Sequence, residues 1–181
     1  GCGLALTLWD LFVESCGDFI LDIGCGAGHV TKSLLNQATI VFNDICNEHL
    51  MLVYDLNHQT PGEGFYLNNK RFPVDVDFPS ESFTSIICSY VGQYLSPQDL
   101  ESSFNKMANC LKPGGVIFYR VLTVYSLPFG FYAPCYEEKI QSGEIWPGYI
   151  EDTTLVMGGT TKNCPTMVHP HGLKEVSYLA Q

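Results

Sequence analysis

The sequence predicts an α/β fold, doubly wound around a mostly parallel sheet. Two observations favour this class. The apolar run at residues 20–23 leads directly into a turn with three alternating glycines, at residues 24–28. A second apolar run, at residues 38–43, is followed by Asp44, which lies 20 residues after Gly24. Doubly wound folds carry a ligand-binding carboxylate at about this distance from such a turn.

We expect strands and helices to alternate along the chain. The expected strands lie near residues 19–23, 38–43, 64–68, 84–89 and 115–121, and the expected helices near 4–15, 28–36, 47–57 and 97–111. The last helix has the clearest signals. Ser96 suits its N-cap, Pro97 suits its first position, and apolar residues recur behind them at helical spacing.

Composition fits one domain and excludes several classes of protein. The 181 residues are 46% hydrophobic, enough for one core, and no apolar run of about 18 residues is present to span a membrane. The net charge is −10 and the basic residues are scattered, which argues against a nucleic-acid substrate. The eight cysteines include no C-x-x-C pair. We interpret them as small core residues of a cytoplasmic protein and predict no metal site.

The glycine turn predicts a ligand. Glycine permits positive φ and lets a ligand approach the backbone closely. A dinucleotide-binding turn requires G-x-G-x-x-G, whereas here Gly28 comes one residue early and His29 takes the sixth position. The dinucleotide pattern also has no requirement for an acid two residues before the first glycine, where this chain has Asp22. A turn without a ligand is the remaining alternative.

Residues 22–28 read D-x-G-x-G-x-G, which resembles the first motif of class I S-adenosylmethionine (SAM)-dependent methyltransferases. Three later segments resemble the same family in the same order. They are an acid, an apolar residue and a small residue before a helix (44–52), a "PFPDxSFD"-like segment with the fourth strand (77–91), and "LKPGG" (111–115). The second departs from the family at Thr84, where aspartate is usual. The likeness is to small-molecule, "methyltransferase type 11"-like members and covers residues 20–121.

The resemblance implies a Rossmann-like sheet with SAM as cofactor and S-adenosylhomocysteine (SAH) as product. In the family, the glycine turn passes under the methionine part of SAM, and the acid at the strand end helps to hold its amino group. Asp44 would bind the ribose and Ile45 would lie against the adenine, although Asp44 could instead cap the next helix. The predicted cofactor-binding residues are Asp22, Gly24, Cys25, Gly26, Gly28, Asp44, Ile45, Phe72 and Ser89, with Asn68, Asn69 and Arg71 as further candidates beside the adenine.

Residues 122–168 are rich in Gly, Pro and aromatic side chains. Long segments of this kind often form lids, and the resembled family carries an insertion here that helps to set substrate specificity. We therefore predict a lid over a small-molecule acceptor, and the alternative is a crossover with ordinary core aromatics. The candidate acceptor contacts are Tyr94, Tyr125, Tyr132 and Trp146.

Methyl transfer from a sulfonium depends mainly on proximity and alignment, so the sequence need not show a catalytic dyad. A general base matters only where the acceptor must lose a proton early. The candidates are His169 as base and Gln93 facing the acceptor. The chain would act on a small molecule, with a protein methyltransferase or a non-catalytic SAM-binding module as alternatives. The oligomeric state is left open.

We expect a single methyltransferase domain over residues 1–181. Residues 1–121 would form the cofactor-binding core, 122–168 the lid, and 169–181 the start of a late helix. In the resembled family, two final strands follow that helix. We expect the natural protein to extend beyond Gln181 to supply them.

Overall fold

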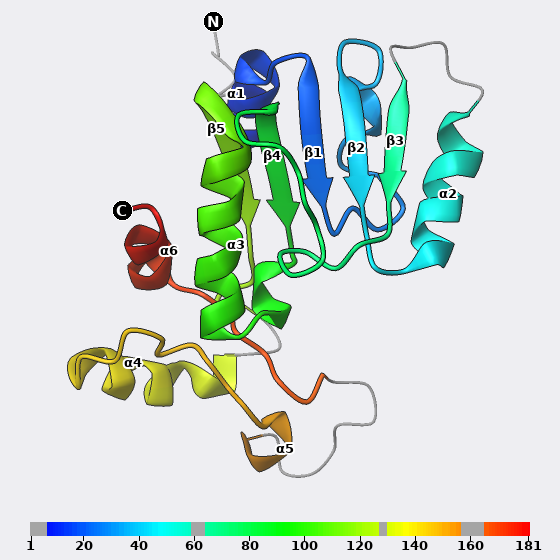
Figure 1. Cartoon of the computed structure of the whole chain (residues 1–181). Coiled ribbons are helices and arrows are strands. Elements are labelled where there is room, and N and C mark those ends of the chain that lie inside the picture. Colours follow the sequence, from blue (N-terminus) through cyan, green and yellow to red (C-terminus); the bar gives the residue numbers. More distant parts are fainter. Residues whose placement is uncertain (1–6, 59–63, 127–129, 157–164) are drawn as a thin grey trace, which may run out of the picture. The chain divides into compact units, whose positions relative to one another are not determined.

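The computed structural model describes residues 7–58, 64–126, 130–156 and 165–181 (Figure 1). The chain divides into two compact units. The first unit comprises Gly1–Ser89 and Asn105–Tyr119, and the second unit comprises Tyr90–Phe104 and Arg120–Gln181. No helix in the described ranges has the length and apolar character that crossing a membrane requires.

The first unit is built on a five-stranded sheet. Its strands are β1 (Phe19–Ile23), β2 (Thr39–Asn43), β3 (Phe65–Asn68), β4 (Phe83–Ser89) and β5 (Leu111–Arg120), in the order β3-β2-β1-β4-β5. The pairs β1–β2, β1–β4 and β2–β3 are parallel, and the five arrows in Figure 1 point the same way. This order confirms the predicted doubly wound fold. Its topological switch point lies between β1 and β4, and ligands of such sheets bind at the carboxyl ends of the strands there.

The central strands form because their side chains are apolar on both faces, as a covered parallel sheet requires. Ile20, Ile40, Phe42 and Ile87 are fully buried in the core of the first unit. The register pairs Ile23 with Asn43. The residues that follow β1 and β2 therefore emerge together at one edge of the sheet.

Three longer helices were predicted close to their observed bounds. They are α1 (Leu8–Ser15), α2 (Asn47–Asn57) and α3 (Pro97–Cys110). A capping box between Thr7 and Asp10 begins α1, so the helix expected from residue 4 starts later, and residues 4–6 lie outside the described ranges. The strand β3, the least clearly signalled, is confirmed within its predicted range.

The helix predicted over residues 28–36 is wrong, because the structure has only the short 3₁₀ helix η1 (Lys32–Leu34) there. Gly28 has φ of 71°, outside the helical region. The β-branched residues Val30 and Thr31 follow it, and the Thr31 hydroxyl is bonded to Asp22. The fifth strand also differs, since it begins at Leu111 rather than near residue 115.

The second unit is more ordered than the structureless segment expected over residues 122–168. Within that range it contains η3 (Gly130–Tyr132), α4 (Ala133–Gln141) and α5 (Thr153–Val156). The unit also contains η2 (Gly92–Tyr94) and α6 (Leu173–Leu179), and α6 lies where the late helix was expected. Its core is formed by Val124, Tyr132, Tyr136, Ile150 and Val168. Beyond β5, the described residues pair as β-structure only in an isolated antiparallel bridge between Ile150 and Val168.

A buried carboxylate joins three segments of the second unit. Glu175, fully buried, accepts hydrogen bonds from the Tyr136 hydroxyl (2.9 Å) and from the backbone N–H groups of Gly148 (3.1 Å) and Gly172 (2.9 Å). Both glycines are required, because an added Cβ would come within 1.9 Å of Pro170 O at Gly148 and of the Tyr136 hydroxyl at Gly172. Glu175 therefore holds α4, the Gly148 loop and the start of α6 together.

Candidate functional site

The glycine turn after β1 presents a bare stretch of backbone. Gly24, Gly26 and Gly28 have φ of 61°, 54° and 71°, which side chains rarely adopt. A Cβ at Gly26 would meet no atom within 4 Å, whereas a Cβ at Gly28 would lie 3.0 Å from the Phe42 ring. Gly28 is thus needed for packing, and Gly26 leaves open space over the turn.

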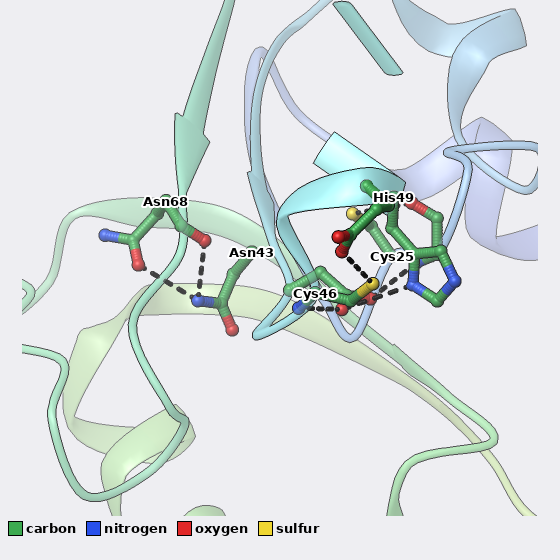
Figure 2. A network of polar contacts seen from close by, with 8 residues as sticks. Cys25, Asn43, Cys46, His49 and Asn68 are labelled. Atoms are coloured by element: carbon green, nitrogen blue, oxygen red, sulfur yellow. Dashed lines mark hydrogen bonds and ion pairs between the residues drawn. The ribbon is translucent and has the colours of Figure 1, made fainter. Parts of the chain in front are cut away.

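Asp44 follows β2 and is tied to this turn. Its Oδ2 accepts the Gly26 N–H at 2.9 Å and its Oδ1 accepts the Cys46 N–H at 2.9 Å (Figure 2). The N-cap of α2 is Cys46, and no side chain caps the helix there. Asp44 therefore does not occupy the N-cap position of α2, and its Oδ1 accepts the N–H of the residue that does. The carboxylate instead joins the ends of β1 and β2.

Asp22 lies two residues before Gly24, the first glycine of the turn, and is almost fully buried. Burial raises the pKa of its carboxyl to about 7, a shift that the Thr31 hydroxyl opposes and the charge of Asp44 reinforces. The Thr31 hydroxyl donates to Asp22 Oδ2 over 2.6 Å. A cation bound beside this carboxyl would favour its ionised form.

The segment after β3 is fixed by Asn43. The Asn43 side-chain amide donates to the backbone and side-chain oxygens of Asn68, at 3.1 and 3.0 Å (Figure 2). It also donates to Lys70 O at 2.7 Å. Next to this network, a cavity of about 590 Å³ is lined by Ile45, Asn69, Lys70, Arg71 and Asp75. The structure therefore brings together three of the residues predicted to surround the adenine.

The other predicted cofactor residues have more buried positions. Phe72 is 7% exposed and does not line that cavity. Ser89 ends β4, beside β1, and is half-buried. Burial and the charges of Asp22 and Asp44 raise the pKa of the Cys25 thiol, which keeps it neutral. Cys25 thus contributes backbone and volume rather than a nucleophile.

The two catalytic candidates lie together in the second unit. The backbone N–H of His169 donates to the backbone oxygen of Gln93 over 2.8 Å. His169 Nδ1 lies 3.2 Å from Leu95 O, so Nδ1 carries the hydrogen and Nε2 carries a lone pair. Nε2 is buried and has no hydrogen-bond partner among the described residues. Burial lowers the pKa of His169 to about 4, so the ring is neutral at pH 7.

Two cavities in the second unit have aromatic walls. They measure about 970 and 610 Å³ and share Lys139, Tyr149 and Glu151. Tyr132 lines the larger cavity and Trp146 the smaller one. The other two predicted acceptor contacts, Tyr94 and Tyr125, are more than half exposed and line neither cavity. Within the described ranges, no group of three His, Cys, Asp or Glu side chains is placed to hold a metal ion.

Sequence reasoning missed four residues of these networks: Thr31, Asn43, His49 and Glu175. His49 Nδ1 lies 3.3 Å from Asp44 Oδ1, and Figure 2 shows the ring at this network. The one usable signal was Asn43, a polar residue at the end of an apolar run. The partners of the other three are set by the fold.

Two curated relatives match about three fifths of the chain. An "Uncharacterized methyltransferase" of Anoxybacillus flavithermus is 28% identical over 115 residues, covering 62% of this chain and 51% of that protein. "Phosphoethanolamine N-methyltransferase 3" of Arabidopsis thaliana is 33% identical over 109 residues, covering 58% of this chain and 21% of that protein. The matched region thus spans about half of one curated relative and a fifth of the other.

Solved structures share the fold. A SAM-dependent methyltransferase of Methanosarcina mazei has a TM-score of 0.67 at 21% identity, covering 97% of this chain and 83% of that one. The YcgJ protein of Bacillus subtilis has a TM-score of 0.61 at 17% identity, with coverages of 94% and 64%. Residues 20–115, more than half of the chain, match the family described as "Methyltransferase domain". The chain therefore belongs to the class I SAM-dependent methyltransferase family.

Proposed function

We propose that the chain binds SAM at the carboxyl ends of β1 and β2 and transfers its methyl group to a small-molecule acceptor. The hydrogen bond of 2.9 Å between Gly26 N and Asp44 Oδ2 carries this proposal. It places a side-chain-free turn beside a carboxylate, and membership of the family supplies the identity of the ligand. A carboxylate in this position suits the hydroxyl groups of a ribose.

The residues of the first unit fit the three parts of the cofactor. Asp44 would accept hydrogen bonds from the ribose, and the cavity beside Ile45, Asn69 and Arg71 would hold the adenine. Asp22 would provide negative charge near the amino group of SAM. This cationic group would in turn stabilise the ionised form of the Asp22 carboxyl. When bound, SAM supplies a methyl group on a sulfonium, so the protein has mainly to align the acceptor with it.

Aromatic cavities in the second unit support a role in acceptor binding. Tyr132, Tyr149 and Trp146 provide apolar walls, and the Glu151 carboxylate lines both cavities, whereas Glu144 is already paired with Lys139 at 3.6 Å. Carboxylates beside aromatic rings favour a cationic ligand. The Arabidopsis relative is named as an N-methyltransferase. We therefore propose an amine as the first acceptor class to test.

His169 stays the candidate base, but its lowered pKa of about 4 makes it a weak base, and it lines neither cavity. Its ring is neutral, with a lone pair at the buried Nε2, and the rings of Trp146 and Tyr149 lie edge-on against it at 5.3 and 5.4 Å. The buried Gln93 side chain accepts the Leu122 N–H at 3.5 Å, so it supports the backbone. The six cysteines in the described ranges are free thiols, which supports the proposed cytoplasmic location.

Isothermal titration calorimetry with SAH, using the full chain, tests the cofactor site. We expect binding by the unchanged protein and a loss of at least about tenfold in Asp44→Asn, since one lost charged hydrogen bond has about this effect. Asp55→Asn, an exposed acid on α2, is the matched control and should bind SAH normally. Absence of SAH affinity in the unchanged protein would contradict the proposal.

Transfer of a labelled methyl group from SAM to a panel of small amines, alcohols and proteins tests the reaction. Labelled amines would support the proposed acceptor class. Labelled proteins would instead indicate a protein methyltransferase. SAM binding without transfer to any acceptor would indicate a non-catalytic module.

A further inference from the structure

The Asp44 carboxylate is shared by three donors from this chain. Oδ2 accepts the Gly26 N–H at 2.9 Å, and Oδ1 accepts the Cys46 N–H at 2.9 Å. His49 Nδ1 lies 3.3 Å from the same Oδ1 (Figure 2). A carboxylate has about four acceptor positions. One position, on Oδ2, therefore remains without a donor from the described part of the chain.

A ribose diol presents two hydroxyl donors and therefore requires two acceptor positions. Asp44 has one open position, on Oδ2, so one of its present donors must leave if both hydroxyls are to bond to it. The Gly26 and Cys46 donors are backbone groups, fixed by the turn and by the start of α2. The His49 side chain is 48% exposed, and its contact is the longest of the three. Of the three donors, His49 can therefore be displaced from Asp44 with the smallest loss of free energy.

We infer that His49 occupies, on Asp44, the hydrogen-bonding position that one ribose hydroxyl of the cofactor takes, so that cofactor binding displaces the His49 ring. This inference rests on the proposed SAM site. His49 acts through Asp44 and is a positioning residue. It keeps the carboxylate oriented in the free protein and competes with the ligand for it.

The His49–Asp44 contact sets the strength of this competition, because the ring must leave Oδ1 before a hydroxyl can bond there. The other titratable groups around this pair are Glu48 and Cys46 at the start of α2, Cys25 in the turn, and Asp22 at the end of β1. Glu48 accepts the Cys46 thiol at 3.1 Å and is exposed. Burial raises the pKa of Asp22 to about 7, so the histidine variants keep Asp22 and all affinities are compared at a single pH.

Calorimetry with SAH on the full chain tests the inference. At a single fixed pH, we expect His49→Ala to bind SAH about two- to fivefold more tightly than the unchanged protein, because an exposed pair of side chains contributes a free energy of about this size. His49→Gln, which retains a neutral donor, should give a smaller gain. His58→Ala, at the other end of α2, is the matched control and should leave the affinity unchanged.

The 2′-deoxyribose analogue of SAH provides a second readout. It requires one acceptor position, which Asp44 already offers, so His49→Ala should not improve its binding. Equal or weaker SAH binding by His49→Ala, or an equal gain for the deoxy analogue, would overturn the inference while leaving the SAM site intact. No SAH binding by the unchanged protein would instead overturn the proposed function, and the inference with it.

Discussion

The Thr31 hydroxyl donates to Asp22 Oδ2 over 2.6 Å inside the first unit, where both residues are almost fully buried. This contact stabilises the ionised carboxylate, whereas burial favours the neutral acid. The pKa of Asp22 is raised to about 7 because burial is the larger effect. Asp22 therefore changes charge in the physiological range, at the strand end where the ligand is proposed to bind.

The affinity for SAH should rise with pH because of Asp22. Raising the pH from about 6 to about 8 ionises the Asp22 carboxyl, whose negative charge attracts the amino group of the ligand. If binding lowers the pKa of Asp22 by about one unit, the affinity rises by about tenfold at most. Calorimetry is best done in the His49→Ala protein, which lacks the contact between His49 and Asp44. A further Asp22→Asn substitution should abolish the pH dependence. Thr31→Val should move it to higher pH, because it removes the hydrogen bond that lowers the pKa.

Gly26→Ala should weaken SAH binding at least about tenfold, since the new methyl group enters the open space over the turn and the residue has φ of 54°. Gly114→Ala is the matched control, because Gly114 also has positive φ and open surroundings but lies in β5, away from the turn. Both changes should lower the free energy of unfolding by about 1–2 kcal/mol. Similar losses of SAH affinity in the two variants would contradict a ligand-facing role for Gly26.

The second unit should become less stable as the pH falls below about 6.5, the ordinary pKa of histidine. Burial lowers the pKa of His169 to about 4 and, with the charge of His169, that of His171 to about 3. Below the ordinary pKa the unfolded chain binds protons that the folded unit excludes, so the free energy of unfolding decreases by up to about 1.4 kcal/mol per pH unit for each ring.

Trp146 fluorescence during urea unfolding measures this effect in a Trp9→Phe background, because the chain has two tryptophans. His169→Asn retains an amide donor near Leu95 O and cannot titrate, so it should reduce the pH slope. An unchanged slope in this variant would show that other groups cause the acid sensitivity.

Glu175→Gln should destabilise the second unit by about 3 kcal/mol, since charged hydrogen bonds to three donors are lost or reversed. Tyr136→Phe removes one of these donors and should cost less. Glu138→Gln, an exposed position on α4, is the control. Trp146 fluorescence in the Trp9→Phe background measures the free energy of unfolding of all three variants. An unchanged free energy of unfolding in Glu175→Gln would contradict the role of Glu175 in joining the three segments.

Trp146→Ala should raise the KM for the acceptor several-fold and leave SAH affinity unchanged, because Trp146 lines a cavity of the second unit. Tyr125→Ala is the comparison, since Tyr125 is 60% exposed and lines neither cavity. Steady-state kinetics with an identified acceptor, together with calorimetry, separate the two effects. Parallel losses of acceptor and SAH affinity would argue against an acceptor-binding role for Trp146.

Several features were predictable because they depend on neighbouring residues. Apolar runs between turn residues indicated β1, β2 and β4, and the order Ser96-Pro97 indicated the start of α3. The spacing of the glycines indicated the positive φ angles that Gly24, Gly26 and Gly28 adopt. The helix predicted over residues 28–36 is absent because Gly28 has φ of 71° and because the Thr31 hydroxyl bonds to Asp22 on β1.

By itself, the sequence determined the class of fold, the bare turn and the carboxylate at Asp44, because strand formation and glycine conformation depend on short stretches of chain. The tertiary structure alone decided which side chains share that carboxylate and how Asp22 titrates. It also decided that Asn43 would bond to Asn68, 25 residues away, and that Glu175 would join three segments of the second unit. Such contacts depend on burial and on distances between remote segments, which exist only once the chain has folded.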